Sequence, residues 1–322
     1  MLRYNEKMST QLFYHLRRSS LIYNVRGYFF NVKERLTGFP QLRMTFKKKT
    51  GYVLDLENPK SFNQKVCWKK IYDRNPLLPV VADKYRVREY LRSVLGTQEA
   101  ERILVPLLYV TDEPETIPFD DLPEEYIIKA NHGSGTNIII EKGKPIDKEK
   151  VIARCNEWLN MPFGLFEREW AYQSIKRKLI IEKLIRDEVG ELPKDYKFHI
   201  FHGRCQLIDI LWDRFSERKR SLFDRSWNYF DIGWKVRRWK KGGFIQKPDN
   251  LEDMIKLAEL LGSPFDYVRV DLYSIKGQIY FGEMTHYPSG GFGAFDPQSF
   301  DFELGSKWQI TPEYWKKGKR QG

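Results

Sequence analysis

The sequence has few cysteines, no long apolar run and neither of the two common glycine-rich nucleotide motifs. Cys67, Cys155 and Cys205 lie far apart and form no CxxC pair or metal-binding spacing, so we interpret them as reduced thiols. No apolar stretch reaches the roughly 18 residues of a membrane-spanning helix. The N-terminus is charged from Arg3 onward and lacks the apolar core of a signal peptide. We therefore expect a cytoplasmic protein. The absence of GxGxxG and of GxxxxGK argues against a Rossmann or P-loop nucleotide site.

Negative charge is scarce in two stretches of a chain whose formal net charge is +12. Residues 1–50 contain eleven lysines and arginines against two acids, Glu6 and Glu34, which gives a net charge of +9. Residues 213–247 contain eleven lysines and arginines against four acids. A basic surface attracts polyanions at long range. Nucleic acid, anionic lipid headgroups, nucleotides and acidic polysaccharides are all candidates, and charge alone does not choose among them.

The length of 322 residues allows two or three compact lobes, and the 41% of hydrophobic residues is typical of a globular chain. Residues 1–50 predict a basic, partly helical arm. The apolar residues that recur near helical spacing there are Leu12, Phe13, Leu16, Leu21 and Ile22. Either this helix packs on the body with a solvated basic face, or it makes peripheral contact with the inner face of a membrane.

The order of the expected elements is mixed, which indicates an α+β fold rather than a regular βαβ series. Helices are predicted at 61–75 and 83–95, on either side of Pro76 and Pro79, and at 147–160 and 251–261. Strands are predicted at 103–110, 126–129, 137–141, 179–185, 196–201, 205–212, 267–273 and 278–283. We divide the chain into a basic N-terminal arm, an N-terminal α/β region and two further units, at 1–50, 51–125, 126–185 and 186–322.

Two acidic residues near the C-terminal end predict a metal site. They lie in the runs RVDL and YFGEMT, which a Lys-Gly turn separates. Because side chains alternate along a strand, Arg269 and Asp271 share one face of the first strand. Glu283 and Thr285 likewise share one face of the second strand. Pairing around the turn is expected to place Asp271 opposite a residue near 280, with Glu283 toward the open end. Two converging carboxylates repel unless a cation separates them, and hard oxygen ligands suit Mg²⁺. Ordinary surface charges on a hairpin are the alternative.

Two further runs have features of a nucleotide site. In YIIKANHGSGT, Lys129 ends an apolar strand, and a loop of small residues follows. Lysine suits a phosphate as a point charge, and glycine and serine amides can wrap phosphate oxygens. In LIIEKLI, an apolar strand breaks into a polar linker that could present its backbone to an adenine, with Glu182 or Asp195 on the ribose. Each run alone also fits a hairpin tip or a buried strand. We interpret the histidines as structural: His199, His202 and His286.

Together and in this order, the runs resemble the ATP-grasp superfamily and, more narrowly, its TupA-like branch, which is named for teichuronopeptide biosynthesis. The resemblance covers about residues 50–300. It is carried by RVDL with GQIYFGEMT, by IIKANHGSG, and by Asp83-Lys84-Tyr85 with Val87-Arg88. It implies an ATP-grasp fold in which two α+β lobes grip ATP. The small lobe with the glycine-rich loop would be 126–185, and the large lobe with the magnesium site would be 186–322.

The resemblance also implies roles for individual residues in binding ATP. Lys84 and Lys129 would bind the phosphates, the loop at 133–136 would close over them, backbone groups at 182–185 would hold the adenine, and Asp195 would bind the ribose. The ATP-binding residues implied in this way are Lys84, Lys129, His132, Gly133, Ser134, Gly135, Glu182, Lys183, Leu184, Ile185, Asp195 and Lys197.

The same resemblance implies that Asp271, Glu283 and Thr285 bind Mg²⁺ and that Arg269 and Lys129 take part in catalysis. Most ATP-grasp enzymes have asparagine where this chain has Thr285, so whether a second ion is held directly or through water stays open. The implied reaction is acyl activation. A carboxylate attacks the γ-phosphate of ATP, and an amine then displaces phosphate from the acyl phosphate to form an amide. Arg269 would face the developing oxyanion.

TupA-like proteins are linked to cell-surface polysaccharide synthesis, so we expect an anionic saccharide or uronic acid as acceptor and an amino acid or amine as co-substrate. The basic, tryptophan-rich stretch 213–247 suits such an acceptor, and we assign acceptor binding to Arg237, Arg238 and Trp239. One alternative is a glycan kinase with the same ATP site. Another is a glycosyltransferase, although no convincing DxD pair occurs. A third is a polyanion binder without activity, which the acidic pair argues against; we expect no nucleic-acid partner.

Overall fold

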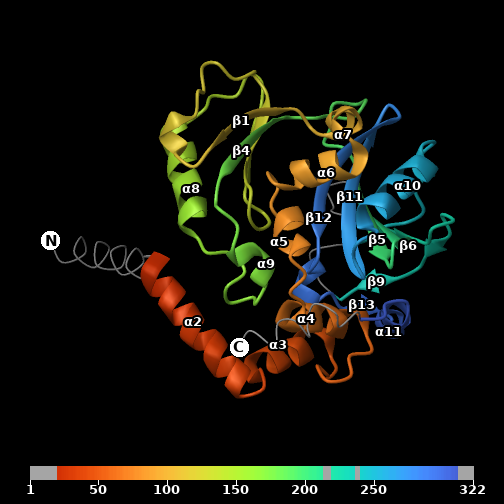
Figure 1. The fold of residues 1–322 in the computed structure, drawn as a ribbon. Helices are drawn as coiled ribbons and strands as arrows, with labels where there is room; N and C mark the ends of the chain where they lie inside the picture. The colour runs from red at the N-terminus through yellow and green to blue at the C-terminus, as the bar shows by residue number, and fades with distance from the viewer. Residues whose placement is uncertain (1–19, 213–218, 236–239, 311–322) are drawn as a thin grey trace.

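The computed structural model describes residues 20–212, 219–235 and 240–310 (Figure 1). Helices and antiparallel strands alternate along it, which confirms the predicted α+β class. The helices are α2 (Ser20–Leu36), α3 (Pro40–Thr50), α4 (Phe62–Tyr72), α5 (Leu77–Ala82), α6 (Val87–Leu95), α7 (Thr97–Ile103), η1 (Pro114–Thr116), α8 (Lys148–Asn160), α9 (Trp170–Gln173), α10 (Leu251–Gly262), η2 (Pro288–Gly291) and α11 (Ser299–Ser306). The strands are β1 (Leu107–Thr111), β2 (Tyr126–Ala130), β3 (Asn137–Ile140), β4 (Leu179–Lys183), β5 (Asp195–Phe201), β6 (Arg204–Trp212), β7 (Lys219–Phe223), β8 (Tyr229–Phe230), β9 (Gly233–Trp234), β10 (Lys240–Lys241), β11 (Tyr267–Ile275), β12 (Gln278–Thr285) and β13 (Phe295–Asp296).

The smaller sheet has the strand order β1-β4-β2-β3 with antiparallel neighbours, and α8 packs on it (Figure 1). The predicted hairpin is confirmed, because β2 and β3 pair with Lys129 opposite Asn137. Burial of Ile128, Ala130 and Ile181 with Cys155 and Trp158 of α8 forms the core of this part. Strand β1 joins the sheet from the stretch that we assigned to the N-terminal α/β region. The division of the chain into four units stays a prediction.

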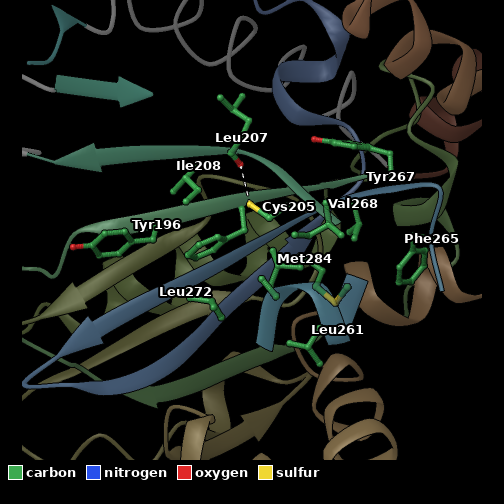
Figure 2. Packing of buried hydrophobic residues seen from close by; sticks show 14 of the residues in the cluster. Tyr196, Cys205, Leu207, Ile208, Leu261, Phe265, Tyr267, Val268, Leu272 and Met284 are labelled. Carbon is green, nitrogen blue, oxygen red and sulfur yellow. Dashed lines mark hydrogen bonds between the residues drawn. The ribbon is translucent and has the colours of Figure 1, made fainter. Parts of the chain in front are cut away.

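The larger sheet has the strand order β10-β7-β6-β5-β11-β12, with β8 paired to β7. Its two faces differ because the sequences of the central strands alternate apolar and polar residues. On one face, β5 and β11 contribute Phe198, Ile200, Val268 and Val270, all fully buried. The buried stripe of α10 covers this face, and Figure 2 shows Leu261 of α10 in the same apolar cluster as Val268, Leu272 and Met284 of the sheet. Apolar burial of this kind contributes roughly 25 cal/mol per Å² and holds the sheet in place.

The opposite face of the larger sheet carries a row of charged residues. Asp209 of β6 pairs with Lys197 of β5, Lys197 pairs with Asp271 of β11, and Asp271 pairs with Glu283 of β12. Residues directly opposite each other on neighbouring strands lie on the same face. Four adjacent strands, with β12 at the edge of the sheet, therefore place four ionisable side chains in one line, which is where the candidate site forms.

Three predicted boundaries before this sheet are wrong. The helix predicted at 61–75 ends at Tyr72, the helix predicted at 83–95 begins only at Val87, and α5 lies between them where we expected a break at the prolines. Pro79 fits α5 because it lies in the first turn, where an N–H has no helical partner. The strand predicted at 103–110 begins only at Leu107, since Ile103 ends α7. A short apolar run does not distinguish the end of a helix from the start of a strand.

The described part of the N-terminal arm is helical, as predicted. Helix α2 packs on the segment before α9, where a Cβ on Gly27 would meet a Leu165 methyl at 2.2 Å. Glu34 of α2 forms a buried ion pair with Arg168 at 2.7 Å. The residues Leu12, Phe13 and Leu16, from which we predicted the helix, lie outside the described part of the chain. Among the residues that the structure describes, no helix is long and apolar enough to cross a membrane.

Candidate active site on the charged face of the larger sheet

The β11–β12 hairpin holds the two predicted metal ligands opposite each other. Asp271 pairs with Glu283, whereas Leu272 already pairs with Phe281, so Gly282 is an extra residue that forms a β-bulge. The expected register, with Asp271 opposite a residue near 280, is therefore wrong. A Cβ on Gly282 would lie 3.0 Å from the carbonyl oxygen of Asp271. The bulge leaves little room for a side chain at this position, and it pairs Glu283 with Asp271.

Arg269 links the two carboxylates. Its Nε and Nη2 donate to the two oxygens of Asp271 at 2.7 Å each, and Nη2 also donates to Glu283 Oε1 at 3.1 Å. Burial alone would lower the pKa of Arg269, but the charges of Asp271 and Glu283 raise it. Burial would raise the pKa of Glu283, but Lys84 and Arg269 hold it at about 2. Glu283 therefore stays ionised at neutral pH.

Thr285 completes the hydrogen bonds of this hairpin. Its hydroxyl donates to Glu283 Oε1 at 3.1 Å and accepts from Arg269 Nη2 at the same distance. The side chain of Asp271 is 2% exposed and that of Glu283 is 33% exposed, so the accessible carboxylate is the second one. Burial raises the pKa of Asp271 against the opposing effect of its cationic neighbours.

Lys197 approaches the pair from β5. Its ammonium group donates to Asp271 Oδ2 and lies 2.6 Å from an oxygen of Asp195. Asp195 and Lys197 are both buried and share one strand face, two residues apart. Both residues that we predicted to bind ATP on this strand are thus part of the same ion-pair network as Asp271.

Lys84 connects the smaller sheet to this network. The residue lies in the turn between α5 and α6, and its N–H donates to the carbonyl of Asn131 at 2.9 Å. Its ammonium group donates to the carbonyl of Gly133 at 2.5 Å and lies 3.9 Å from Glu283 Oε2. Burial lowers the pKa of Lys84. One lysine therefore contacts both the glycine-rich loop and the accessible carboxylate.

Lys129 and Glu182 form a second ion pair, next to Lys84. Lys129 Nζ lies 2.7 Å from Glu182 Oε2, and Arg88 Nη1 lies 3.2 Å from Glu182 Oε1. The pair forms because β2 and β4 are neighbours in the smaller sheet. The structure thus places Lys129, Lys84, Arg269 and Glu283 in one connected region. Glu182 forms ion pairs with both Lys129 and Arg88, and sequence analysis did not predict these contacts.

The glycine-rich loop has a buried base and an exposed tip. His132 is buried with its ring nitrogens near the carbonyl of Trp158 (3.2 Å) and Asn131 Oδ1 (3.3 Å), and burial lowers its pKa to about 4. Gly133 has φ 80°, and a Cβ there would meet the Phe163 ring at 2.6 Å. Ser134 and Gly135 are exposed. The tip is therefore the part of the loop that can reach a ligand, whereas His132 supports the base.

Asn131 is a residue whose role was not predicted. Its Nδ2 donates to Asp83 Oδ1 and to the carbonyl of Lys176, each at 2.9 Å, and its Oδ1 accepts from the N–H of Lys178 at 2.8 Å. These bonds fix the position of Lys84 relative to the loop. The available signal was that each lysine of the predicted pair has a short polar neighbour, Asp83 or Asn131, close by in the sequence.

The segment predicted to hold adenine, 182–185, begins within the last two residues of β4. Lys183 is exposed, Leu184 is buried and Ile185 is half-buried. The N–H of Lys183 donates to the carbonyl of Pro106 at 3.0 Å. The predicted acceptor residues Arg237, Arg238 and Trp239 lie outside the described residues. Of the nearby tryptophans, Trp227 is buried against Phe223 with ring centroids 4.4 Å apart, which makes it a packing residue.

The chemistry of the donors fits a magnesium ion that is bound together with a polyphosphate. Asp271, Glu283 and Thr285 offer hard oxygen ligands on adjacent strands. Within the described ranges no cluster of three or more histidine, cysteine, aspartate or glutamate side chains stands at metal-binding spacing. The ion would therefore need ligands from a bound phosphate as well, which is how Mg²⁺ commonly binds in nucleotide sites.

Comparison with known proteins identifies the class to which this fold and site belong. A family model, described as TupA-like ATP-grasp, matches residues 64–309. The protein is thus an ATP-grasp enzyme, and more narrowly it belongs to the TupA-like ATP-grasp family. This result confirms the family that we predicted. No curated protein matches the sequence.

Similar solved structures include ATP-grasp ligases. D-alanine–D-alanine ligase from Helicobacter pylori is 12% identical, with a TM-score of 0.42 over 79% of this chain and 70% of the other. The Bacillus anthracis enzyme in complex with ATP is 16% identical, with a TM-score of 0.41 over 82% of this chain and 76% of the other. Phosphoribosylamine–glycine ligase from Thermotoga maritima is 11% identical, with a TM-score of 0.40 over 68% and 52%.

Proposed function

We propose that this protein is an ATP-dependent carboxylate–amine ligase that forms an amide bond through an acyl phosphate. The observation that carries the proposal is the pairing of Asp271 with Glu283 on neighbouring strands, with Arg269 bonded to both carboxylates and Lys84 beside Glu283. Opposed carboxylates within a ring of cations suit a nucleotide polyphosphate and its Mg²⁺. Membership of the ATP-grasp family supports the nucleotide part of the proposal.

Asp271 and Glu283 would hold the Mg²⁺, and Thr285 would keep Glu283 in place through its hydrogen bond. The ion would supply charge neutralisation for the transferring phosphoryl group. Lys84 and Lys129 would bind phosphate oxygens, and the exposed tip at 134–135 would cover them and exclude water. Phosphoryl transfer of this type depends chiefly on positioning and on charge stabilisation, so no protein nucleophile is required.

The adenine and ribose would bind beside the end of β4. Since the N–H of Lys183 already donates to Pro106, the backbone groups of Leu184 and Ile185 are those that would meet the adenine edge. Asp195 would accept hydrogen bonds from the ribose hydroxyls, because a carboxylate retains acceptor sites beside its ion pair with Lys197. Arg269 would orient Asp271 and stabilise the oxyanion that develops during amide formation.

The carboxylate substrate would be a uronic acid or another acidic unit of a cell-surface polysaccharide, of the capsule or teichuronopeptide type, and the amine an amino acid or amino sugar. The excess of lysine and arginine in residues 213–247 supports an anionic acceptor, because cations meet carboxylates and aromatic faces stack on sugar rings. Arg237, Arg238 and Trp239, in the middle of this stretch, are the proposed acceptor residues.

The test is ADP release from Mg-ATP with a panel of uronic acids and amino acids, followed by mass spectrometry of the product. Hydroxylamine is added in a parallel assay, because it converts an acyl phosphate into a stable hydroxamate. We expect ADP release that needs the carboxylate, a hydroxamate with hydroxylamine, and an amide when the amine is present. A stable phosphate ester on a sugar hydroxyl, without a hydroxamate, would instead identify a glycan kinase.

A further inference from the structure

Helix α2 carries a stripe of exposed apolar side chains, opposite the positions of the helix that pack on the body. The stripe consists of large apolar side chains whose exposed fractions run from 38% at Val32 to 81% at Leu36. Its members are Val25, Tyr28, Phe29, Val32 and Leu36. At about 100° per residue, these five positions fall within an arc of about 100°. The five side chains therefore form one continuous apolar surface on one side of the helix.

The opposite side of α2 packs against the rest of the protein, and this packing prevents the helix from rotating to bury the stripe. Gly27 lies against Leu165, and the Phe30 ring lies 5.4 Å from the Phe166 ring. Glu34 is buried in its ion pair with Arg168. These contact positions lie about 140° to 200° around the helix from Val25. In Figure 1, α2 extends along the outside of the molecule, away from both sheets.

Positive charge borders the stripe on both sides. Arg26 and Lys33 lie about 80° to 100° from its centre on one side, and Arg35 lies about 80° from it on the other. All three are exposed, whereas the carboxylate of this helix, Glu34, is buried and neutralised by Arg168. An apolar face with flanking cations is the pattern of a helix that lies in the plane of an anionic membrane surface.

A cavity of about 640 Å³ adjoins the stripe on the side of Arg35. It lies between α2, α4 and the segment before α9, and Tyr28, Val32 and Leu36 line it as well as belonging to the stripe. Its other walls include Lys70 and Arg74, and within the described chain no carboxylate is part of its lining. Lys70 is buried, so the further positive charge that a phosphate-bearing headgroup would meet here is that of Arg74.

From this arrangement we infer that α2 docks the enzyme on an anionic membrane surface, with the stripe inserted among the lipids and Arg26, Lys33 and Arg35 at the headgroups. Charge complementarity favours lipid over a second copy of the chain, because two copies would bring these three cations against their counterparts. The inference is separate from the proposed ligase reaction, since it concerns a surface on the N-terminal helix and no residue of the β11–β12 hairpin.

The experiment is co-sedimentation of the full chain, without nucleotide, with phosphatidylcholine vesicles that do or do not contain phosphatidylglycerol. We expect binding to the anionic vesicles, weakened by salt, and a loss of at least about tenfold in affinity for a variant with both Phe29→Glu and Leu36→Glu. Arg26→Glu with Lys33→Glu should also weaken binding. The matched control is Met44→Glu, since Met44 is exposed on α3 outside the stripe and its replacement should leave affinity unchanged.

Two results would overturn the inference. One is equal affinity of the wild type and the Phe29→Glu, Leu36→Glu variant for anionic vesicles. The other is a dimer in lipid-free solution that the same variant converts to a monomer, because a second copy would then be the occupant of the stripe. Circular dichroism of the variant confirms that the fold is retained, so a loss of binding is not mistaken for unfolding.

Discussion

At the scale of single residues, the candidate site depends on buried charges that neutralise one another. Asp271 is almost fully buried and is matched by Arg269 and Lys197, whereas Glu283 is partly exposed. Breaking a buried ion pair typically costs 3–5 kcal/mol, because it leaves an uncompensated charge. The two carboxylates should therefore respond differently to substitution.

Replacing Glu283 by glutamine should abolish Mg-ATP turnover and leave the fold intact. The amide keeps the shape and the hydrogen bond from Thr285, but it removes the accessible negative charge that would bind the metal. We expect ADP release to fall by at least about 100-fold, with a melting temperature close to that of the wild type. Glu303→Gln, an exposed position on α11, is the control. Full activity of Glu283→Gln would refute the assignment.

Asp271→Asn should also abolish turnover, but at a cost in stability. Arg269 and Lys197 would lose their shared partner in a buried position, and we expect a loss of roughly 3–5 kcal/mol in the free energy of unfolding. Urea unfolding of the wild type and the variant measures this difference. A variant as stable as the wild type would show that Asp271 does not compensate these two cations.

His132 should make stability depend on pH. Burial lowers its pKa from 6.5 to about 4, so the unfolded chain takes up a proton before the folded chain does. The contribution of neutral His132 is complete above about pH 6.5 and is lost progressively as the pH falls toward 4, by roughly 2–3 kcal/mol in all. Urea unfolding between pH 4 and 8 should show this slope reduced in His132→Gln and unchanged in His202→Gln, an exposed control. Parallel slopes for wild type and His132→Gln would contradict it.

At the scale of elements, the β-bulge in β12 aligns the two carboxylates. Sequence alternation predicted the two strands, the turn and the faces of Arg269 and Asp271. It did not predict the register, because an extra residue shifts the pairing by one and leaves only a glycine as its trace. The ion pair of Lys197 with Asp271 could not be predicted either, since β5 and β11 are distant in the chain and no local sequence feature specifies that they pair.

Gly282→Ala should reduce turnover more than it reduces stability. The added Cβ would lie 3.0 Å from a backbone oxygen of Asp271 and 3.2 Å from the Tyr273 ring, so these neighbours must give by a few tenths of an ångström, which we expect to disturb the alignment of the two carboxylates. We expect a loss of roughly 1–3 kcal/mol in stability and a loss of ADP release of at least about tenfold. The matched control is Gly243→Ala, where a Cβ meets no atom within 4 Å. Equal activities of the two variants would show that the bulge does not position Glu283.

The helices show the same limit of local pattern. The N-cap at Ser61 was predicted correctly. Its hydroxyl accepts from the N–H of Gln64 at 3.1 Å, as a capping box requires. The boundary near Ile103 was not predicted, because apolar residues continue from the end of α7 into β1 with only Pro106 between them. Helix α10 was predicted nearly residue for residue, since its apolar spacing is long and regular.

At the scale of the whole molecule, Glu34 joins the N-terminal helices to the rest of the protein. It pairs with Arg168, and its carboxylate also accepts from the N–H groups of Gln41 and Leu42 at the start of α3. One buried side chain thus connects α2, α3 and the segment before α9. The orientation of the apolar stripe relative to the body depends on this junction.

Replacing Glu34 by glutamine should loosen α2 and leave the larger sheet unaffected. Arg168 would lose the charge that compensates it, at a cost of roughly 3–5 kcal/mol that falls on the contacts of α2 with the body. We expect faster amide hydrogen exchange in α2 and α3, unchanged exchange in β5 and β11, and unchanged ADP release. The control is Glu99→Gln, whose exposed ion pair with Arg102 contributes at most about 1 kcal/mol. Global loss of protection in Glu34→Gln would mean that the arm and the catalytic sheet unfold as one cooperative unit, and the arm could then not be treated as a separate docking element.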